Sequence, residues 1–71
     1  RRIQQVLTLR DMPDVFDAGE YLNRNSMPPG TASWLLSEFA KQGLLDRLER
    51  GRYRILPETR ELIAKLEKTP N

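Results

Sequence analysis

Between Pro29 and Ile55 the spacing of apolar residues changes from the period of a helix to that of a strand, and Gly43 marks the change. On a helix of 100° per residue, one arc of about 140° contains Ala32, Leu35, Leu36, Phe39, Ala40 and Gly43. A stripe of this width predicts an amphipathic helix over about residues 29–42 that buries one face. Pro29 suits its first turn, because a first-turn residue needs no N–H donor.

Two alternating runs follow Gly43, over residues 44–49 and 52–56, with Arg50-Gly51 between them. This pattern predicts a two-stranded β-hairpin. With Arg50 and Gly51 at the centre of the turn, the expected pairs are Glu49–Arg52, Leu48–Tyr53, Arg47–Arg54 and Asp46–Ile55. The face toward the core would then hold Leu48, Tyr53 and Ile55. The opposite face would hold Arg47, Arg52 and Arg54, where the Arg47–Arg54 pair costs stability that an external anion would restore.

Helices are also predicted at both ends of the chain. Residues 1–10 have helical spacing, with an apolar side that comprises Ile3, Val6 and Leu7. Pro13 ends that helix, and Val15-Phe16 is long enough only for a short extended pair. The last helix begins at Pro57, and its apolar stripe comprises Thr59, Leu62, Ile63 and Leu66. This stripe either closes the core on the first helix or forms a homodimer through the terminal helices.

Asp17 and Glu20 have the spacing of a capping box, in which each side chain accepts a backbone N–H of the other residue. The pattern predicts a helix over residues 18–24. Its inward side is expected to comprise Ala18, Tyr21 and Leu22.

The chain has 71 residues, and none of them is cysteine or histidine. A chain of this length forms a single domain, residues 1–71, with 69–71 as a tail. The missing residue types exclude disulfides, the common zinc sites, thiol nucleophiles and imidazole bases, so we expect no enzyme, no metal and no cofactor. No apolar run approaches the roughly 20 residues of a membrane-spanning helix, and a cytoplasmic location is expected. Because the sequence begins at Arg1 without a signal pattern, it is expected to be a fragment of a longer protein.

The predicted helix and hairpin resemble the recognition helix and wing of bacterial regulators of the MarR and IclR type, in the winged helix-turn-helix superfamily. The resemblance in motif covers residues 31–55, and in element order about residues 1–68. It depends on a hydroxyl residue at the helix start, paired apolar residues, a Gly-Leu-Leu step and a basic wing with an aromatic residue: Thr31, Leu35-Leu36, Gly43-Leu44-Leu45 and Arg50-Gly51-Arg52-Tyr53.

This resemblance implies an α+β fold, a small winged helix-turn-helix with a three-helix core, a two-stranded wing and a C-terminal helix. It also implies double-stranded DNA binding in a bacterial or phage transcriptional regulator, with the helix of about 29–42 in the major groove and the wing 47–54 on the backbone or minor groove. By position, the helix would contact bases and phosphates through Thr31, Ser33, Trp34, Ser37 and Lys41. The wing would contact DNA through Arg47, Arg50, Arg52 and Arg54.

The net charge of +2 is unevenly distributed. Residues 41–54 carry five cationic and two acidic side chains, whereas residues 11–40 carry one cationic and five acidic side chains. Wing arginines can bind phosphate and release counterions without reading sequence. The helix offers only Lys41, and Glu38 on the same face repels phosphate unless it accepts from a cytosine amine. The charge distribution therefore supports DNA contact by the wing more strongly than DNA contact by the helix.

Trp34, the only tryptophan of the chain, falls opposite the buried stripe of its helix. The ring could contact a DNA groove, form a protein or subunit interface, or lie half-buried against a terminal helix. The second possibility gives the alternative function, a winged-helix module for protein–protein interaction that uses the face around Trp34. Glu38 and the near-neutral net charge also favour this alternative.

Overall fold

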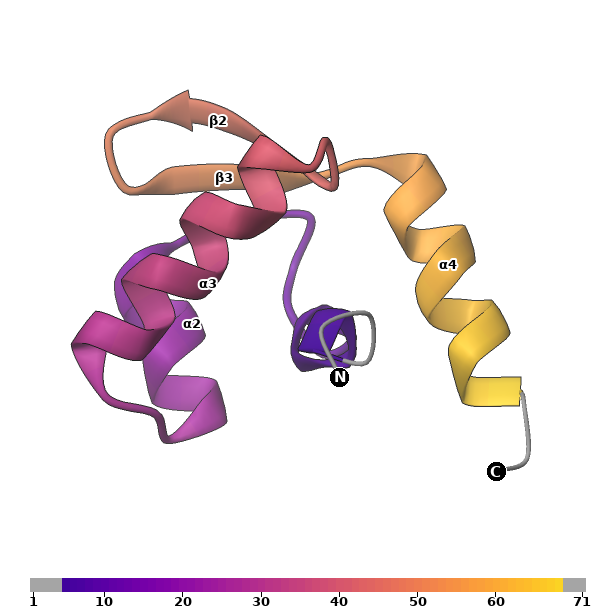
Figure 1. Ribbon diagram of the computed structural model, residues 1–71, viewed down its shortest axis with the longest axis horizontal. Coiled ribbons are helices and arrows are strands. Elements are labelled where there is room, and N and C mark those ends of the chain that lie inside the picture. The colour runs from indigo at the N-terminus through magenta and orange to yellow at the C-terminus, as the bar shows by residue number, and fades with distance from the viewer. Residues whose placement is uncertain (1–4, 69–71) are drawn as a thin grey trace.

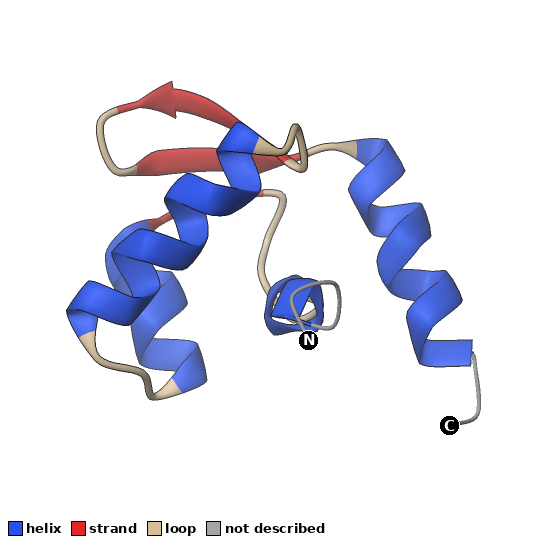
Figure 2. Ribbon diagram, in the orientation of Figure 1, coloured by secondary structure: helices blue, strands red, loops and turns tan. Residues whose placement is uncertain are grey.

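The helices and strands follow one another in the predicted order. The computed structural model describes residues 5–68. The elements are η1 (Val6–Leu9), β1 (Val15–Asp17), α2 (Ala18–Asn25), α3 (Pro29–Lys41), β2 (Leu45–Glu49), β3 (Arg52–Ile55) and α4 (Pro57–Lys68) (Figures 1 and 2). Within the described part of the chain, three α-helices and a three-stranded antiparallel sheet form a small α+β unit.

The sheet contains one strand more than the predicted hairpin. Its order is β1-β3-β2, so β3 is the central strand and bonds to both neighbours. The extended pair Val15-Phe16 is part of β1, which lies antiparallel to β3 with Phe16 opposite Tyr53. A three-residue strand has no detectable alternation of its own. Its pairing with residues far along the chain is therefore a property of the tertiary structure.

The hairpin register agrees with the prediction at the turn and departs from it beyond. Glu49 lies opposite Arg52, as expected, but a bulge between Arg47 and Glu49 shifts the remaining pairs. These pairs are Arg47–Tyr53, Asp46–Arg54 and Leu45–Ile55. Leu48, which the sequence predicts in the core, is 42% exposed. The buried residue of β2 is Leu45, which lies opposite Ile55. The predicted repulsion between Arg47 and Arg54 is therefore absent, because the bulge adds one residue to one strand only.

Within the described residues, the predicted first helix is α-helical at Gln5 and continues as a 3₁₀-helix over Val6–Leu9. Residues 1–4, including Ile3, lie outside the described part of the chain. The buried residues of η1 are Val6 and Leu9, whereas Leu7 is half-buried. A 3₁₀-helix places residues i and i+3 on one side, which explains why Leu9 is buried in place of Leu7.

The other helices match their predictions closely. The capping box is present, since Glu20 N donates to Asp17 Oδ1 at 2.9 Å and Asp17 N donates to Glu20 Oε1 at 3.2 Å. Ser26, in the left-handed region with φ 51°, ends α2. Residues 26–28 then lead into α3, which begins at Pro29 and packs against α2.

Every element contributes to one core. In Figure 1 the sheet lies along one side of α2 and α3, and α4 lies on the far side of η1 from these two helices. Buried residues come from all of these elements: Val6, Leu9, Met12, Phe16, Tyr21, Ala32, Leu35, Leu36, Phe39, Leu45, Tyr53, Ile55 and Ile63. Along α4, Thr59 and Ile63 are buried and Leu62 and Leu66 are half-buried, so the predicted stripe packs toward the core and η1.

Arg60 of α4 joins the C-terminal helix to the segment after η1. Its Nη2 donates to Met12 O at 2.6 Å, and its Nη1 donates to Arg10 O at 3.2 Å and Leu9 O at 3.4 Å. Nε and Nη2 also donate to Asp14 Oδ1, at 3.2 and 3.0 Å. One planar guanidinium thus binds carbonyls at the end of a helix and a carboxylate beyond it, which a lysine could not do.

Arg60→Met is expected to lower the free energy of unfolding by about 2–3 kcal/mol, because several acceptors lose a charged donor. Urea denaturation of both proteins measures this change. Arg47→Met, which makes the same chemical change at an exposed side chain, is the control and is expected to change stability by about 0.5 kcal/mol or less. Equal effects of the two substitutions would show that the Arg60 contacts add nothing to stability.

Tyr21 gives the fold a second, pH-dependent test. Its ring is buried, its Oη lies 2.7 Å from Thr8 Oγ1, and burial raises its pKa above the ordinary value of 10, a rise that the Thr8 hydrogen bond reduces. A raised pKa means that the folded state holds the proton more tightly. The contribution of Tyr21 to the free energy of unfolding is therefore fully present below about pH 10. It is lost as pH rises from about 10 through the pKa of the folded state, by at most about 1.4 kcal/mol per pH unit.

Thermal or urea unfolding between pH 9 and pH 11.5 measures this loss. Tyr21→Phe removes the titrating group and is expected to give a shallower pH dependence over that range, although its stability at pH 7 is lower. A parallel decline in both proteins would assign the alkaline loss to other groups.

Candidate nucleic-acid interface

The outer face of α3 carries the five residues that the sequence places on a recognition helix. All five are exposed: Thr31, Ser33, Trp34, Ser37 and Lys41. The opposite face is buried through Ala32, Leu35, Leu36 and Phe39. Trp34 is 48% exposed, so its ring is not packed into the core. Glu38 is half-buried and lies on the same helix between Ser37 and the core face.

Hydrogen bonds tie both ends of β3 to other segments of the chain. Gly51, with φ 77°, takes the left-handed turn position that favours glycine. Its carbonyl accepts from Ala18 N at 2.9 Å, which ties the turn to the start of α2. At the other end of β3, Ile55 N donates to Asp14 O at 2.8 Å. Because β1 also pairs with β3, the arginines of the hairpin are held on a three-stranded sheet and not on a free ribbon.

Arg52 and Arg54 lie on the sheet face away from the core, and each is paired with an acid. Arg52 Nη1 lies 3.1 Å from Glu49 Oε2, and Arg54 Nη2 lies 3.2 Å from Asp46 Oδ2. Asp17 of β1 is the other cross-strand neighbour of Arg52. The predicted register placed Asp46 opposite Ile55, and only the bulged register brings it opposite Arg54. Sequence reasoning therefore missed this pairing.

Arg47 does not share a face with Arg52 and Arg54, which corrects the predicted cluster. Its position opposite Tyr53 puts it on the face toward the core, and α3 packs against β2 on that side. Arg50 is exposed at the turn. Within residues 5–68, no ion pair or hydrogen bond involves the side chains of Arg47, Arg50 or Lys41.

The predicted wing therefore divides into two parts with different electrostatics. On its outer face, two arginines stand among three acids, Asp17, Asp46 and Glu49. At the tip and on the α3 side, Arg50 and Arg47 carry unneutralised charge. A phosphate meets no internal competitor at Arg47 and Arg50, but it has to displace a carboxylate at Arg52 and Arg54.

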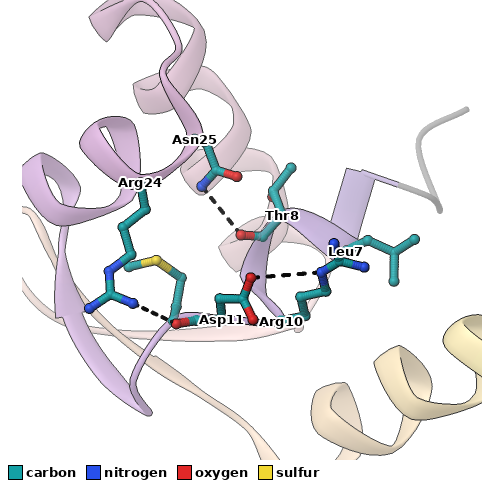
Figure 3. Close-up of a pocket in the computed structure, with 7 residues that line it drawn as sticks. Leu7, Thr8, Arg10, Asp11, Arg24 and Asn25 are labelled. Atoms are coloured by element: carbon teal, nitrogen blue, oxygen red, sulfur yellow. Dashed lines mark hydrogen bonds and ion pairs between the residues drawn. The ribbon is translucent and has the colours of Figure 1, made fainter.

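A surface hollow lies between η1 and α2, away from the wing, with a volume of about 360 Å³ (Figure 3). It is lined by Leu7, Thr8, Arg10, Asp11, Met12, Arg24 and Asn25. Arg24 Nη1 donates to Asp11 O at 2.8 Å, and Asn25 Nδ2 donates to Thr8 O at 3.3 Å. No local sequence pattern predicts this hollow, because its walls come from two segments that meet only in the tertiary structure.

Comparison of the chain with protein-family models, with curated proteins and with solved structures finds no match. No helix among the described residues is long and apolar enough to span a membrane. Over the same residues, no three or more acidic side chains converge into a group that could hold a metal ion.

Proposed function

We propose that the chain binds double-stranded DNA as the winged helix-turn-helix domain of a transcriptional regulator, of bacterial or phage type and cytoplasmic. In this proposal α2, residues 26–28 and α3 are the helix-turn-helix, α3 enters the major groove, and the hairpin contacts the flanking backbone or minor groove. The observation that carries it is that all nine predicted contact residues are exposed, with two unpaired arginines on the wing.

The chemistry of α3 supports positioning on DNA more than strong attraction to it. Thr31, Ser33 and Ser37 offer hydroxyls that can donate to phosphates or pair with base edges. In the first turn the N–H groups of Gly30 and Thr31 precede the first bond of the helix, from Ala32 N to Pro28 O at 3.0 Å. These N–H groups are suited to a phosphate oxygen. Lys41, in the last turn, adds a mobile cation.

Attraction to the duplex comes mainly from the unpaired cations of the wing. Each phosphate neutralised by an arginine releases counterions and makes affinity depend on salt. Exposed ion pairs such as Arg52–Glu49 contribute about 0–1 kcal/mol, so DNA can break them, but the released carboxylate stays close and repels phosphate. Arg47 and Arg50 should therefore contribute more to binding than Arg52 and Arg54.

The direct test is a titration of a labelled random-sequence duplex, followed by fluorescence anisotropy at 50 and 200 mM salt. Binding that weakens steeply with salt supports the proposal, because sequence-independent contacts appear before any specific site is known. No binding at the lower salt concentration would contradict it.

Among arginine variants, Arg47→Ala with Arg50→Ala is expected to reduce the slope of log affinity against log salt by about 1.8, or about 0.9 for each lost phosphate contact. Arg52→Ala with Arg54→Ala is the matched double variant and is expected to have a smaller effect. Conversely, Asp46→Asn with Glu49→Gln frees both paired arginines and is expected to strengthen binding. If the Arg47 and Arg50 variant bound DNA like the parent protein, the wing assignment would be wrong.

A protein–protein module is the second candidate, and the exposure of Trp34 favours it. A tryptophan that is 48% exposed at the middle of a helix is a typical anchor for a protein partner. Leu48 and Val15 are also exposed, at 42% and 37%. Under this candidate the face of α3 binds a protein, and the half-buried Leu62 and Leu66 of α4 could extend into a homodimer.

Because Trp34 is the only tryptophan, its fluorescence reports on the α3 face alone. If α3 enters the groove, duplex DNA is expected to quench Trp34 emission with the same midpoint as the anisotropy titration. A poly-anion such as heparin, at matched charge, is the control for contacts that do not involve bases. Unchanged emission in the presence of bound DNA would remove α3 from the DNA contact and favour the protein module.

A further inference from the structure

The lining of the hollow between η1 and α2 includes two arginines and two apolar residues. Arg10 follows η1 and Arg24 is in the last turn of α2, so the two guanidiniums come from different elements (Figure 3). The apolar residues of the lining are Leu7, which is half-buried, and Met12, which is 3% exposed. A volume of about 360 Å³ is within the range of small-ligand sites.

Both guanidiniums have donors to spare. Arg24 uses Nη1 to bind Asp11 O, and none of its other N–H groups has a hydrogen-bond partner within residues 5–68. Arg10 makes no side-chain hydrogen bond in the described structure, only ion pairs with Asp11 at 3.8 Å and Glu67 at 3.5 Å. Asn25 uses its Nδ2 for Thr8 O and Tyr21 O, which leaves its Oδ1 as an acceptor.

Asp11 shows which chemical group suits this position. Its carboxylate lines the hollow and pairs with Arg10, and Figure 3 shows it between the two arginines. At 3.8 Å the contact is an ion pair without a hydrogen bond, and the side chain of Asp11 is 82% exposed. Such a carboxylate can turn into solvent at little cost, and another carboxylate can take its place.

We propose that this hollow binds the carboxylate of a small organic acid, with the acid's short hydrocarbon chain on Leu7 and Met12. Arg24 and Arg10 donate to the carboxylate, because a guanidinium matches a planar carboxylate with two parallel bonds. Asn25 Oδ1 accepts from a hydroxyl or ammonium group if the acid carries one. The site is separate from the α3 face and the wing, so it stands or fails independently of DNA binding.

The test is a titration of the full chain with sodium hexanoate, followed by ¹H–¹⁵N spectra that include the Asn25 side-chain amide and the arginine Nε–H groups. We expect saturable shifts at Thr8, Arg24 and Asn25. Hexanol at the same concentrations lacks the carboxylate and is expected to leave the Arg24 Nε–H unshifted. Equal shifts with hexanol, or shifts that do not saturate, would overturn the proposal.

Three variants make the assignment specific. Arg24→Met and Arg10→Met are each expected to weaken hexanoate binding at least fivefold, and two positions guard against a folding defect at either one. Asp11→Asn removes the competing carboxylate and is expected to strengthen binding at least twofold. Arg47→Met is the matched control for loss of a distant cation and is expected to bind as the parent protein does. If Arg47→Met weakens binding as much as Arg24→Met, the proposal fails.

The carboxylate could come from a free acid or from the C-terminus of a peptide. A short peptide that ends in leucine, with a free carboxyl group or an amide, distinguishes these sources. Binding of hexanoate alone assigns the site to free acids, and binding of the free-carboxyl peptide but not its amide extends it to peptide ends. Binding of neither overturns the proposal.

Discussion

The guanidinium of Arg60 donates hydrogen bonds to four residues near the start of the fold and so ties that segment to the last helix. Carbonyls at the end of a short helix have no partners within it, and η1 is too short to be stable by itself. Arg60 binds the carbonyls of Leu9, Arg10 and Met12, and it holds Asp14 just before β1 begins. The path of the chain from η1 into the sheet therefore depends on a residue near the other end of the sequence.

From that point the sheet determines where the charges lie. Asp14 O accepts from Ile55 N, and β1 then pairs along β3, which makes β3 the central strand. The two arginines of β3 consequently have neighbours on both sides, and most of these neighbours are acidic. Their pairing reduces the positive potential of the outer sheet face, whereas Arg50 and Arg47 keep theirs. The predicted cluster of three arginines on one face is therefore divided: Arg52 and Arg54 are paired with acids on the outer face, whereas Arg47 on the α3 side has no ion pair within residues 5–68.

This distribution is compatible with moderate and salt-sensitive attraction to a polyanion, and it separates the roles of the two proposed contact elements. The wing supplies charge without sequence information, while α3 supplies hydroxyls, backbone donors and one large ring. The same α3 face would serve a protein partner if charge were unimportant, because the exposed Trp34 suits a protein surface and Glu38 repels phosphate. The hollow lined by Arg10 and Arg24 lies on other elements, and neither proposed function requires it.

The sequence by itself determined the features that local physical chemistry controls. Asp17 and Glu20 cap α2, Pro29 begins α3, the period of α3 assigns its buried face, and Gly51 sets the hairpin turn, because each depends on residues a few positions apart. Only the tertiary structure decided the bulge at Leu48, the third strand, the acids beside Arg52 and Arg54, and the four acceptors of Arg60. Those features arise from contacts between segments that are distant in the chain. A one-residue shift in register, which no local pattern encodes, was enough to move Arg47 to the other face of the sheet.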